Sequence, residues 1–152
     1  MCEPLYIRWT DCNNLGIPIL DEQHRSIVST LNTLHHFIRL GKSESIIDAI
    51  LNTLDQHTSI HFTTEEQLLL KSGYPDLNKH ISSHRRLLQK TNQIICSPDG
   101  RLQEGEILRF FKDWWLDHIH TEDREYVPYL LEASEQQDPL AVIAGKWSCP
   151  TW

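Results

Sequence analysis

The segment His61-Phe-Thr-Thr-Glu65-Glu66 places an imidazole and a carboxylate four residues apart. Residues at this spacing lie one turn apart on the same face of an α-helix, so both side chains can reach one point in space. The same face continues as a stripe of apolar residues, formed by Ile47, Ile50, Leu51, Leu54, Leu68 and Leu69. Because an ionised carboxylate is costly to bury unless it is paired or binds a metal ion, Glu65 predicts a polar site inside a helical protein. Glu66 is expected to point elsewhere and to be solvated.

Two further predicted helices carry histidines on their apolar faces. One starts near Asp21, a good N-cap, and ends at Gly41, and its apolar stripe includes His24. The other carries His80 and His84, again four residues apart. A single histidine in such a stripe is usually an ordinary core residue, whereas a His-x-x-x-His pair can hold one metal ion. Neutral imidazoles suit iron, zinc or copper.

A fourth helix begins around residues 104–106 and carries His118 on its inward side. Asp123 follows five residues later, which corresponds to about 140° around an ideal helix. The two side chains therefore cannot share one narrow face. They could bracket a site from two sides, or a local π-bulge could bring them together. Pro128 predicts a kink or break within this segment.

Short connections such as Gly41-Lys42 join the predicted helices. Short connections make neighbouring helices antiparallel, so the sequence predicts an all-α protein, an up-down-up-down four-helix bundle. We expect an N-terminal arm packed on the bundle over residues 1–20, the bundle over residues 21–133, and a C-terminal tail over residues 134–152. Asp138-Pro139 favours a short fifth helix in that tail.

Seven inward polar residues can then meet in one core cavity, because the inner faces of a bundle converge. They are His24, His61, Glu65, His80, His84, His118 and Asp123. Burying them without counter-charge would cost many kcal/mol, and two divalent ions would satisfy them all. If both carboxylates bridge, the five nitrogens divide three and two. With a bridging oxygen, one metal then reaches six-coordination, and the other keeps an open position for a small ligand. The alternative is a metal-free polar network in which every residue finds a protein partner.

Composition excludes several other classes of function. The chain has 152 residues, enough for one domain, and a formal charge of −7, which argues against nucleic acid as a partner. No apolar run approaches the roughly 20 residues of a membrane span. The N-terminus lacks a basic region followed by an apolar stretch, so we expect a cytoplasmic protein.

The four cysteines are Cys2, Cys12, Cys96 and Cys149. None forms a Cys-x-x-Cys pair, so neither a zinc knuckle nor a thioredoxin-type site is indicated. In a reducing cytosol we expect four free thiols.

Five segments together resemble the bacteriohemerythrins of the hemerythrin family. They are Asp21-Glu-Gln-His24, His61-Phe-Thr-Thr-Glu65-Glu66, Gly73-Tyr-Pro75, His80-Ile-Ser-Ser-His84 and Trp115-Leu-Asp-His118-Ile-His-Thr-Glu-Asp123. Their order and spacing match over roughly residues 5–133, and all seven of the family's ligand positions are present. Leu69 stands where the family often has Met, which is a volume-conserving difference.

The resemblance implies a non-haem di-iron centre, oxo- or hydroxo-bridged, that binds O2 reversibly for storage, transport or delivery and is not an enzyme. It implies that Glu65 and Asp123 bridge the irons. It assigns three histidines, His80, His84 and His118, to the coordinatively filled iron and two, His24 and His61, to the iron with the vacant position. Ile119 matches a position that lines the family's apolar O2 pocket.

Two other functions remain open at this stage. Hemerythrin domains occur in signalling proteins, so the chain could sense O2, nitric oxide or redox state through a protein partner at the Trp-bearing tail. A di-iron peroxidase or oxidase is less favoured, because ferritin-like enzymes use Glu-rich sites with two Glu-x-x-His motifs. The remaining histidines match no ligand position, and we interpret them as having no metal role: His35, His36, His57 and His120.

Overall fold

The computed structural model of the protein describes residues 5–95 and 104–137. The regular structure in these ranges is entirely helical. The helices are η1 (Asp11–Asn13), α1 (Pro18–Arg39), α2 (Glu44–Ser72), α3 (Leu77–Ile95), α4 (Glu104–His120) and α5 (Glu122–Gln137). The first residues of the predicted tail over 134–152 belong to α5, which ends at Gln137. The rest of that tail, residues 138–152 with the predicted short fifth helix, lies outside the described residues.

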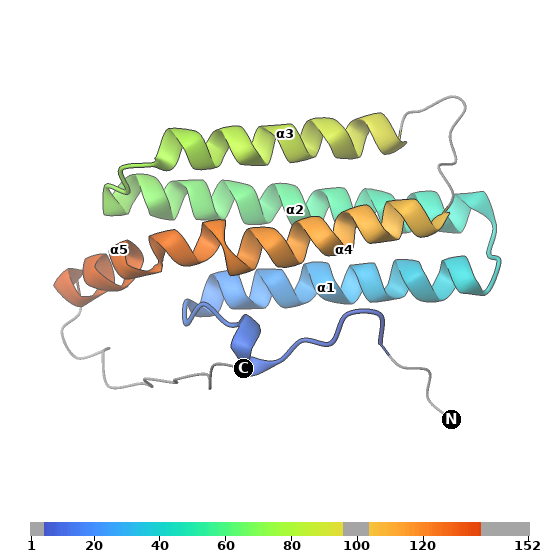
Figure 1. The fold of residues 1–152 in the computed structure, drawn as a ribbon, viewed down its shortest axis with the longest axis horizontal. Coiled ribbons are helices and arrows are strands. Elements are labelled where there is room, and N and C mark those ends of the chain that lie inside the picture. Colours follow the sequence, from blue (N-terminus) through green and yellow to red (C-terminus); the bar gives the residue numbers. More distant parts are fainter. Residues whose placement is uncertain (1–4, 96–103, 138–152) are drawn as a thin grey trace.

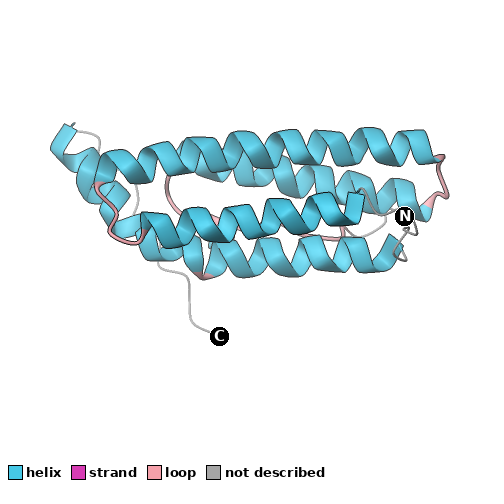
Figure 2. Ribbon diagram, turned by 90° about the horizontal axis from the view of Figure 1, so that it is seen from above, coloured by secondary structure: helices cyan, strands magenta, loops and turns pink. Residues whose placement is uncertain are grey.

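Helices α1 to α4 run side by side along the long axis of the molecule and alternate in direction (Figures 1 and 2). Helix α2 packs against α1 and α3, while α4 packs against α1, and α5 contacts both α4 and α2. The prediction of an all-α, up-down-up-down four-helix bundle is therefore confirmed. Gly73 ends α2 in the left-handed conformation, with a φ of 69°, which a residue without a Cβ adopts readily.

Helix α1 begins at Pro18, three residues before the predicted start at Asp21. Proline suits the first turn of a helix because its missing N–H would be unpaired there anyway. Asp21 is instead buried and binds the segment that precedes the helix. Its carboxylate accepts hydrogen bonds from the backbone N–H of Leu15, at 2.6 Å, and of Gly16, at 3.1 Å.

The break predicted near Pro128 is in the wrong place. Helix α5 continues through Pro128, and the interruption falls at Thr121, between α4 and α5. Proline removes one i→i−4 hydrogen bond, here the one to the carbonyl of Arg124. Because Arg124 is exposed, its carbonyl can accept a hydrogen bond from water instead. The interruption at Thr121 lies between His118 and Asp123, the two residues that an ideal helix would have separated.

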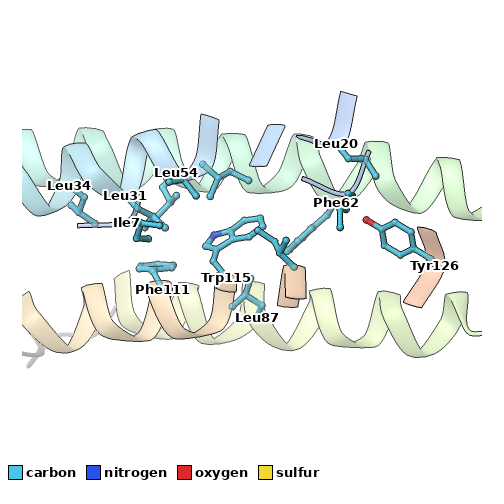
Figure 3. Close-up of a cluster of buried hydrophobic side chains, with 14 of the residues drawn as sticks. Ile7, Leu20, Leu31, Leu34, Leu54, Phe62, Leu87, Phe111, Trp115 and Tyr126 are labelled. Carbon is cyan, nitrogen blue, oxygen red and sulfur yellow. The ribbon is translucent and has the colours of Figure 1, made fainter. Parts of the chain in front are cut away.

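The core is a continuous apolar cluster along the bundle axis (Figure 3). Its completely buried members include Leu20, Ile27, Leu31, Leu34, Leu54, Leu69, Leu87, Trp115, Ile119 and Tyr126. In Figure 3, Trp115 and Tyr126 lie on opposite sides of Phe62 along the axis. The polar cluster described below is embedded in this apolar core.

The N-terminal segment from residue 5 packs along α1. The backbone N–H of Ile7 donates to Oδ1 of Asn32 at 2.8 Å, and Nδ2 of Asn32 donates to the Ile7 carbonyl at 2.9 Å. Tyr6 stacks on His35 with ring centroids 4.5 Å apart. One end of η1 contacts the junction of α4 and α5, where Arg124 donates to the Cys12 carbonyl.

Cys12 is disulfide-bonded, so the expectation of four free thiols is wrong. The other three cysteines lie outside the described residues. Sequence spacing carried no signal for this bond because none of the cysteines forms a recognisable pair.

Candidate metal centre

Five imidazoles turn their Nε2 atoms toward one buried space between the helices. The structure brings together all seven residues singled out in the sequence: His24 from α1, His61 and Glu65 from α2, His80 and His84 from α3, His118 from α4, and Asp123 from α5. Each is at most 4% exposed. Their role as metal ligands remains a prediction, which the geometry below makes specific.

The donors divide into two groups, and within each group they lie within 4.8 Å of one another. The first group consists of Glu65, His80, His84 and His118. The second group consists of His24, His61 and Asp123. Each group can therefore surround one cation, with three imidazoles in the first group and two in the second.

The two carboxylates connect these groups. Glu65 places Oε1 at 2.5 Å from Nε2 of His80 and Oε2 at 3.0 Å from Nε2 of His61. Asp123 places Oδ1 at 3.0 Å from Nε2 of His118 and Oδ2 at 3.3 Å from Nε2 of His24. Each carboxylate thus offers one oxygen to each group, which is the arrangement that a pair of bridged metal ions requires.

Several atoms at the centre lack the hydrogen bonds that burial normally demands. Oε2 of Glu65 and both oxygens of Asp123 accept no hydrogen bond of good geometry from the described residues. The Nε2 atoms of His24 and His61 lie 3.1 Å apart, a contact that is favourable without a cation only when one of the two rings carries its proton on Nε2. Since unsatisfied buried polar atoms are costly, the donor set fits cations better than it fits a closed hydrogen-bond network.

Both carboxylates keep their negative charge in spite of burial. Burial alone would raise the pKa of Glu65, yet the neighbouring imidazoles of His61 and His80 hold it well below its usual range. Burial and the charge of Glu65 would raise the pKa of Asp123, and the imidazole of His118 outweighs them and lowers it. The site therefore presents two buried negative charges to any cation.

Two imidazoles have strongly shifted pKa values in opposite directions. Burial lowers the pKa of His84 to about 3, so this ring is neutral and can donate a lone pair. Burial also opposes a charge on His118, but the nearby carboxylate of Asp123 and that of Glu122 raise its pKa to about 10. Without metal, His118 is therefore an imidazolium that partly neutralises the two carboxylates, and a metal ion would displace its proton.

The opposite nitrogens of three rings face side chains outside the cluster. Nδ1 of His84 donates to Oε1 of Glu66 at 2.9 Å, and Nδ1 of His118 lies 3.5 Å from Oε2 of Glu122. The third ring, His61, donates from Nδ1 to the amide oxygen of Gln23 at 3.2 Å. The hydrogen bonds of His84 and His61 place a proton on Nδ1 and leave Nε2 for the centre, and the charge of Glu122 favours a proton on Nδ1 of His118. The expectation that Glu66 is merely solvated is wrong, because it binds a candidate ligand.

Aromatic side chains surround the cluster. Trp115 lies with its ring centroid 5.7 Å from that of His24 and 5.5 Å from that of His61. Tyr126 lies on the other side, 5.5 Å from His80, and its buried hydroxyl has no hydrogen-bond partner among the described residues. Neither residue was assigned a role at the site from the sequence. Their i−3 and i+3 spacing from His118 and Asp123 was the available signal.

Ile119, the predicted O2-pocket residue, is completely buried in the core. The four histidines without a ligand position also lie outside the two donor groups. His57 contacts Thr30 at 3.1 Å rather than His61, and His120 contacts Asn13 at 3.0 Å.

The fold and the buried cluster define a class of protein, a four-helix bundle whose core contains groups of residues that could hold metal ions. A family model described as the hemerythrin HHE cation binding domain matches residues 15–130. The chain therefore belongs to the hemerythrin family.

Similar proteins agree with this placement. The chain is 30% identical over 128 residues to a bacteriohemerythrin of Clostridium acetobutylicum, covering 78% of this chain and 97% of that protein. It is 29% identical over 123 residues to a bacteriohemerythrin of Pseudomonas paraeruginosa, covering 80% of each. A crystal structure of wild-type hemerythrin superimposes with a TM-score of 0.73 at 26% identity, covering 82% of this chain and 98% of that one. No helix among the described residues is long and apolar enough to cross a bilayer.

Proposed function

We propose that the seven clustered residues hold two iron ions and that the protein binds O2 reversibly, for storage, transport or delivery. The observation that carries this proposal is the division of the donors into a group with three imidazoles and a group with two. Unequal groups leave unequal numbers of free coordination positions. The group with fewer protein donors is the one that can accept a small ligand.

Glu65 and Asp123 are proposed as the bridging ligands. Each lies between the two groups with one oxygen toward a histidine of either group. Buried negative charge from two carboxylates offsets most of the charge that two divalent cations bring into an apolar core. Their placement therefore supports a paired centre rather than two independent sites.

The open position is proposed to lie beside His24 and His61. Two iron ions would supply the electrons and the vacant position that reversible O2 binding needs. Trp115 borders both imidazoles, and Ile119, which is completely buried, belongs to the same apolar core. Apolar side chains at this place exclude water and hinder the entry of protons, which favours release of the ligand unchanged over irreversible oxidation.

A role as an O2 carrier is preferred over the two alternatives. The donor set is rich in histidine, and the described residues provide no pair of Glu-x-x-His motifs of the kind that ferritin-like di-iron enzymes use. A sensor would need an output surface, and the tail that was its candidate lies outside the described residues. We therefore propose no enzymatic activity.

The test is a visible spectrum of the anaerobically reduced, iron-loaded protein before and after admission of O2. The proposal expects a colourless sample that becomes coloured in O2 and bleaches again when O2 is removed. The variant His24→Gln should lose this response, whereas His36→Gln, on an exposed part of the same helix, should keep it. Colour that develops once and never reverses would refute reversible binding.

A further inference from the structure

The two groups differ in the number of their donors. They also differ in the side chains that contact the outer nitrogen, Nδ1, of each imidazole. In the three-imidazole group, Nδ1 of His84 donates to Glu66 at 2.9 Å, and Nδ1 of His118 lies at ion-pair distance from Glu122, 3.5 Å, without a hydrogen bond of good geometry. In the two-imidazole group, His61 faces the neutral amide of Gln23, and Nδ1 of His24 has no partner among the described residues.

These outer contacts are fixed by further hydrogen bonds. Ser83 donates to Glu122 at 3.0 Å and holds that carboxylate beside His118. The amide nitrogen of Gln23 donates to Thr64 at 3.0 Å, which forces its oxygen toward His61. Hydrogen bonds therefore hold the carboxylate of Glu122 beside one group and the amide oxygen of Gln23 beside the other, so the difference does not depend on a chance rotamer.

Aromatic packing also differs between the groups, and it holds the imidazoles of the three-imidazole group more firmly. Phe62 stacks almost parallel on His84, with centroids 3.7 Å apart and planes at 8°. Trp114 stacks on His118 at 4.6 Å and 15°. The aromatic neighbours of His24 and His61 meet them only at tilted or edge-on angles of 43° to 70°. Two imidazoles of the first group are thus clamped in orientation before any metal arrives.

A carboxylate that accepts the Nδ1 proton makes an imidazole a stronger donor at Nε2. Prior orientation also reduces the freedom that must be lost when the metal binds. Resting on the proposed two-metal centre, we propose that Glu66 and Glu122 are positioning residues that make the three-imidazole group the high-affinity position. Metal fills that position first and leaves it last, so the protein has a stable form with one metal beside His84 and His118.

The test is a titration of the metal-free protein with Co²⁺, followed by visible absorption. The wild type should bind two ions per chain in two resolved steps. The variants Glu66→Gln and Glu122→Gln keep the size of the side chain and remove its charge. Each should weaken the first step about 10- to 100-fold and change the second step less than about threefold. Gln23→Glu adds a carboxylate beside His61 and should strengthen the second step.

Glu22→Gln is the matched control. Glu22 is an exposed carboxylate near the same end of the bundle, paired with Arg25 rather than with an imidazole. If it weakens the first step as much as Glu66→Gln does, only the general negative charge matters and the inference is wrong. Equal affinities of the wild type for the first and the second Co²⁺ ion would also overturn the inference. Far-ultraviolet circular dichroism of the metal-free variants should match the wild type.

Co²⁺ binding does not depend on O2 chemistry, so the two proposals can fail separately. Two-step metal binding without any reversible O2 response would leave the inference standing and refute the proposed function. Reversible O2 binding in a protein that takes up both ions in one step of equal affinity would refute the inference alone.

Discussion

His118 and Asp123 lie on opposite sides of a helix interruption, yet Nε2 of His118 is only 3.0 Å from Oδ1 of Asp123. In an uninterrupted helix, two residues at this spacing point about 140° apart. The interruption at Thr121 brings them together, and η1 contacts it from outside, where Nδ2 of Asn13 lies 3.0 Å from Nε2 of His120. The shape of the backbone at this point therefore determines whether the second carboxylate reaches the centre.

Replacing Asp123 with Asn should impair metal binding while sparing the fold. Asparagine has nearly the same shape but lacks the charge that bridges the two groups. We expect the variant to retain fewer than two irons per chain after gel filtration. Without metal it should be less stable than the wild type, because the buried imidazolium of His118 loses the carboxylate that lies 3.0 Å away and offsets its charge. Metal analysis and urea unfolding measure the two effects, and full retention of both irons would contradict the bridging role.

Removing the metal should lower stability. The metal-free protein buries two carboxylates, and Oε2 of Glu65 and both oxygens of Asp123 lack hydrogen bonds of good geometry. Any ligand that binds only the folded state stabilises it, by about 4 kcal/mol when it is present at 1,000 times its dissociation constant. Calorimetry with and without a chelator should show a clearly lower Tm for the metal-free form. An unchanged Tm would mean that the cluster is a self-sufficient polar network.

Trp115→Ala should open space beside His24 and His61. The indole is 1% exposed and packs on both rings, so its removal leaves a cavity next to the proposed ligand position. We expect a loss of about 3–5 kcal/mol in unfolding free energy. We also expect faster exchange of small ligands and faster irreversible oxidation, measured by stopped-flow absorption. Trp114→Phe, at a ring that stacks on His118 instead, is the comparison and should change ligand exchange much less.

The metal-free protein should be most stable near pH 6.5. The pKa of His84 is lowered to about 3 in the folded protein, against an ordinary value of 6.5. The unfolded chain therefore binds more protons below pH 6.5, and stability falls as the pH drops toward 3. The pKa of His118 is raised to about 10, so its contribution is complete below pH 6.5 and is lost as the pH rises toward 10.

Urea midpoints between pH 4 and 9.5, in the presence of a chelator, measure this profile. His118→Gln should flatten the alkaline side and leave most of the acid side in place. A stability that keeps rising up to pH 9.5 in the wild type would contradict the assignment of the imidazolium to His118.

The sequence was sufficient for the bundle and for the seven clustered residues because helical periodicity places His61 with Glu65, and His80 with His84, on single faces. It could not show how Asp123 reaches the same site as His118, because that depends on an interruption at Thr121 that no proline or glycine marks. Pro128, the expected breaker, lies inside α5. At both Thr121 and Pro128, the packing of the folded protein and not the local helix propensity decides whether the helix continues.

The outer contacts of the imidazoles were also beyond the sequence. Glu66 and Glu122 follow or precede a predicted ligand directly, and periodicity turns such neighbours away from the core. In the structure, Glu66 does point away from the core, but its carboxylate meets the outer nitrogen of His84 on the next helix. Only the packing of α2 against α3 reveals this contact.

The most direct test of the central claim is a crystal structure of the aerobically prepared, iron-loaded protein, with anomalous difference maps on both sides of the iron absorption edge. The account predicts two iron peaks per chain, one among His80, His84 and His118 and one between His24 and His61, with Glu65 and Asp123 touching both. A single peak, or none within the cluster, would contradict it.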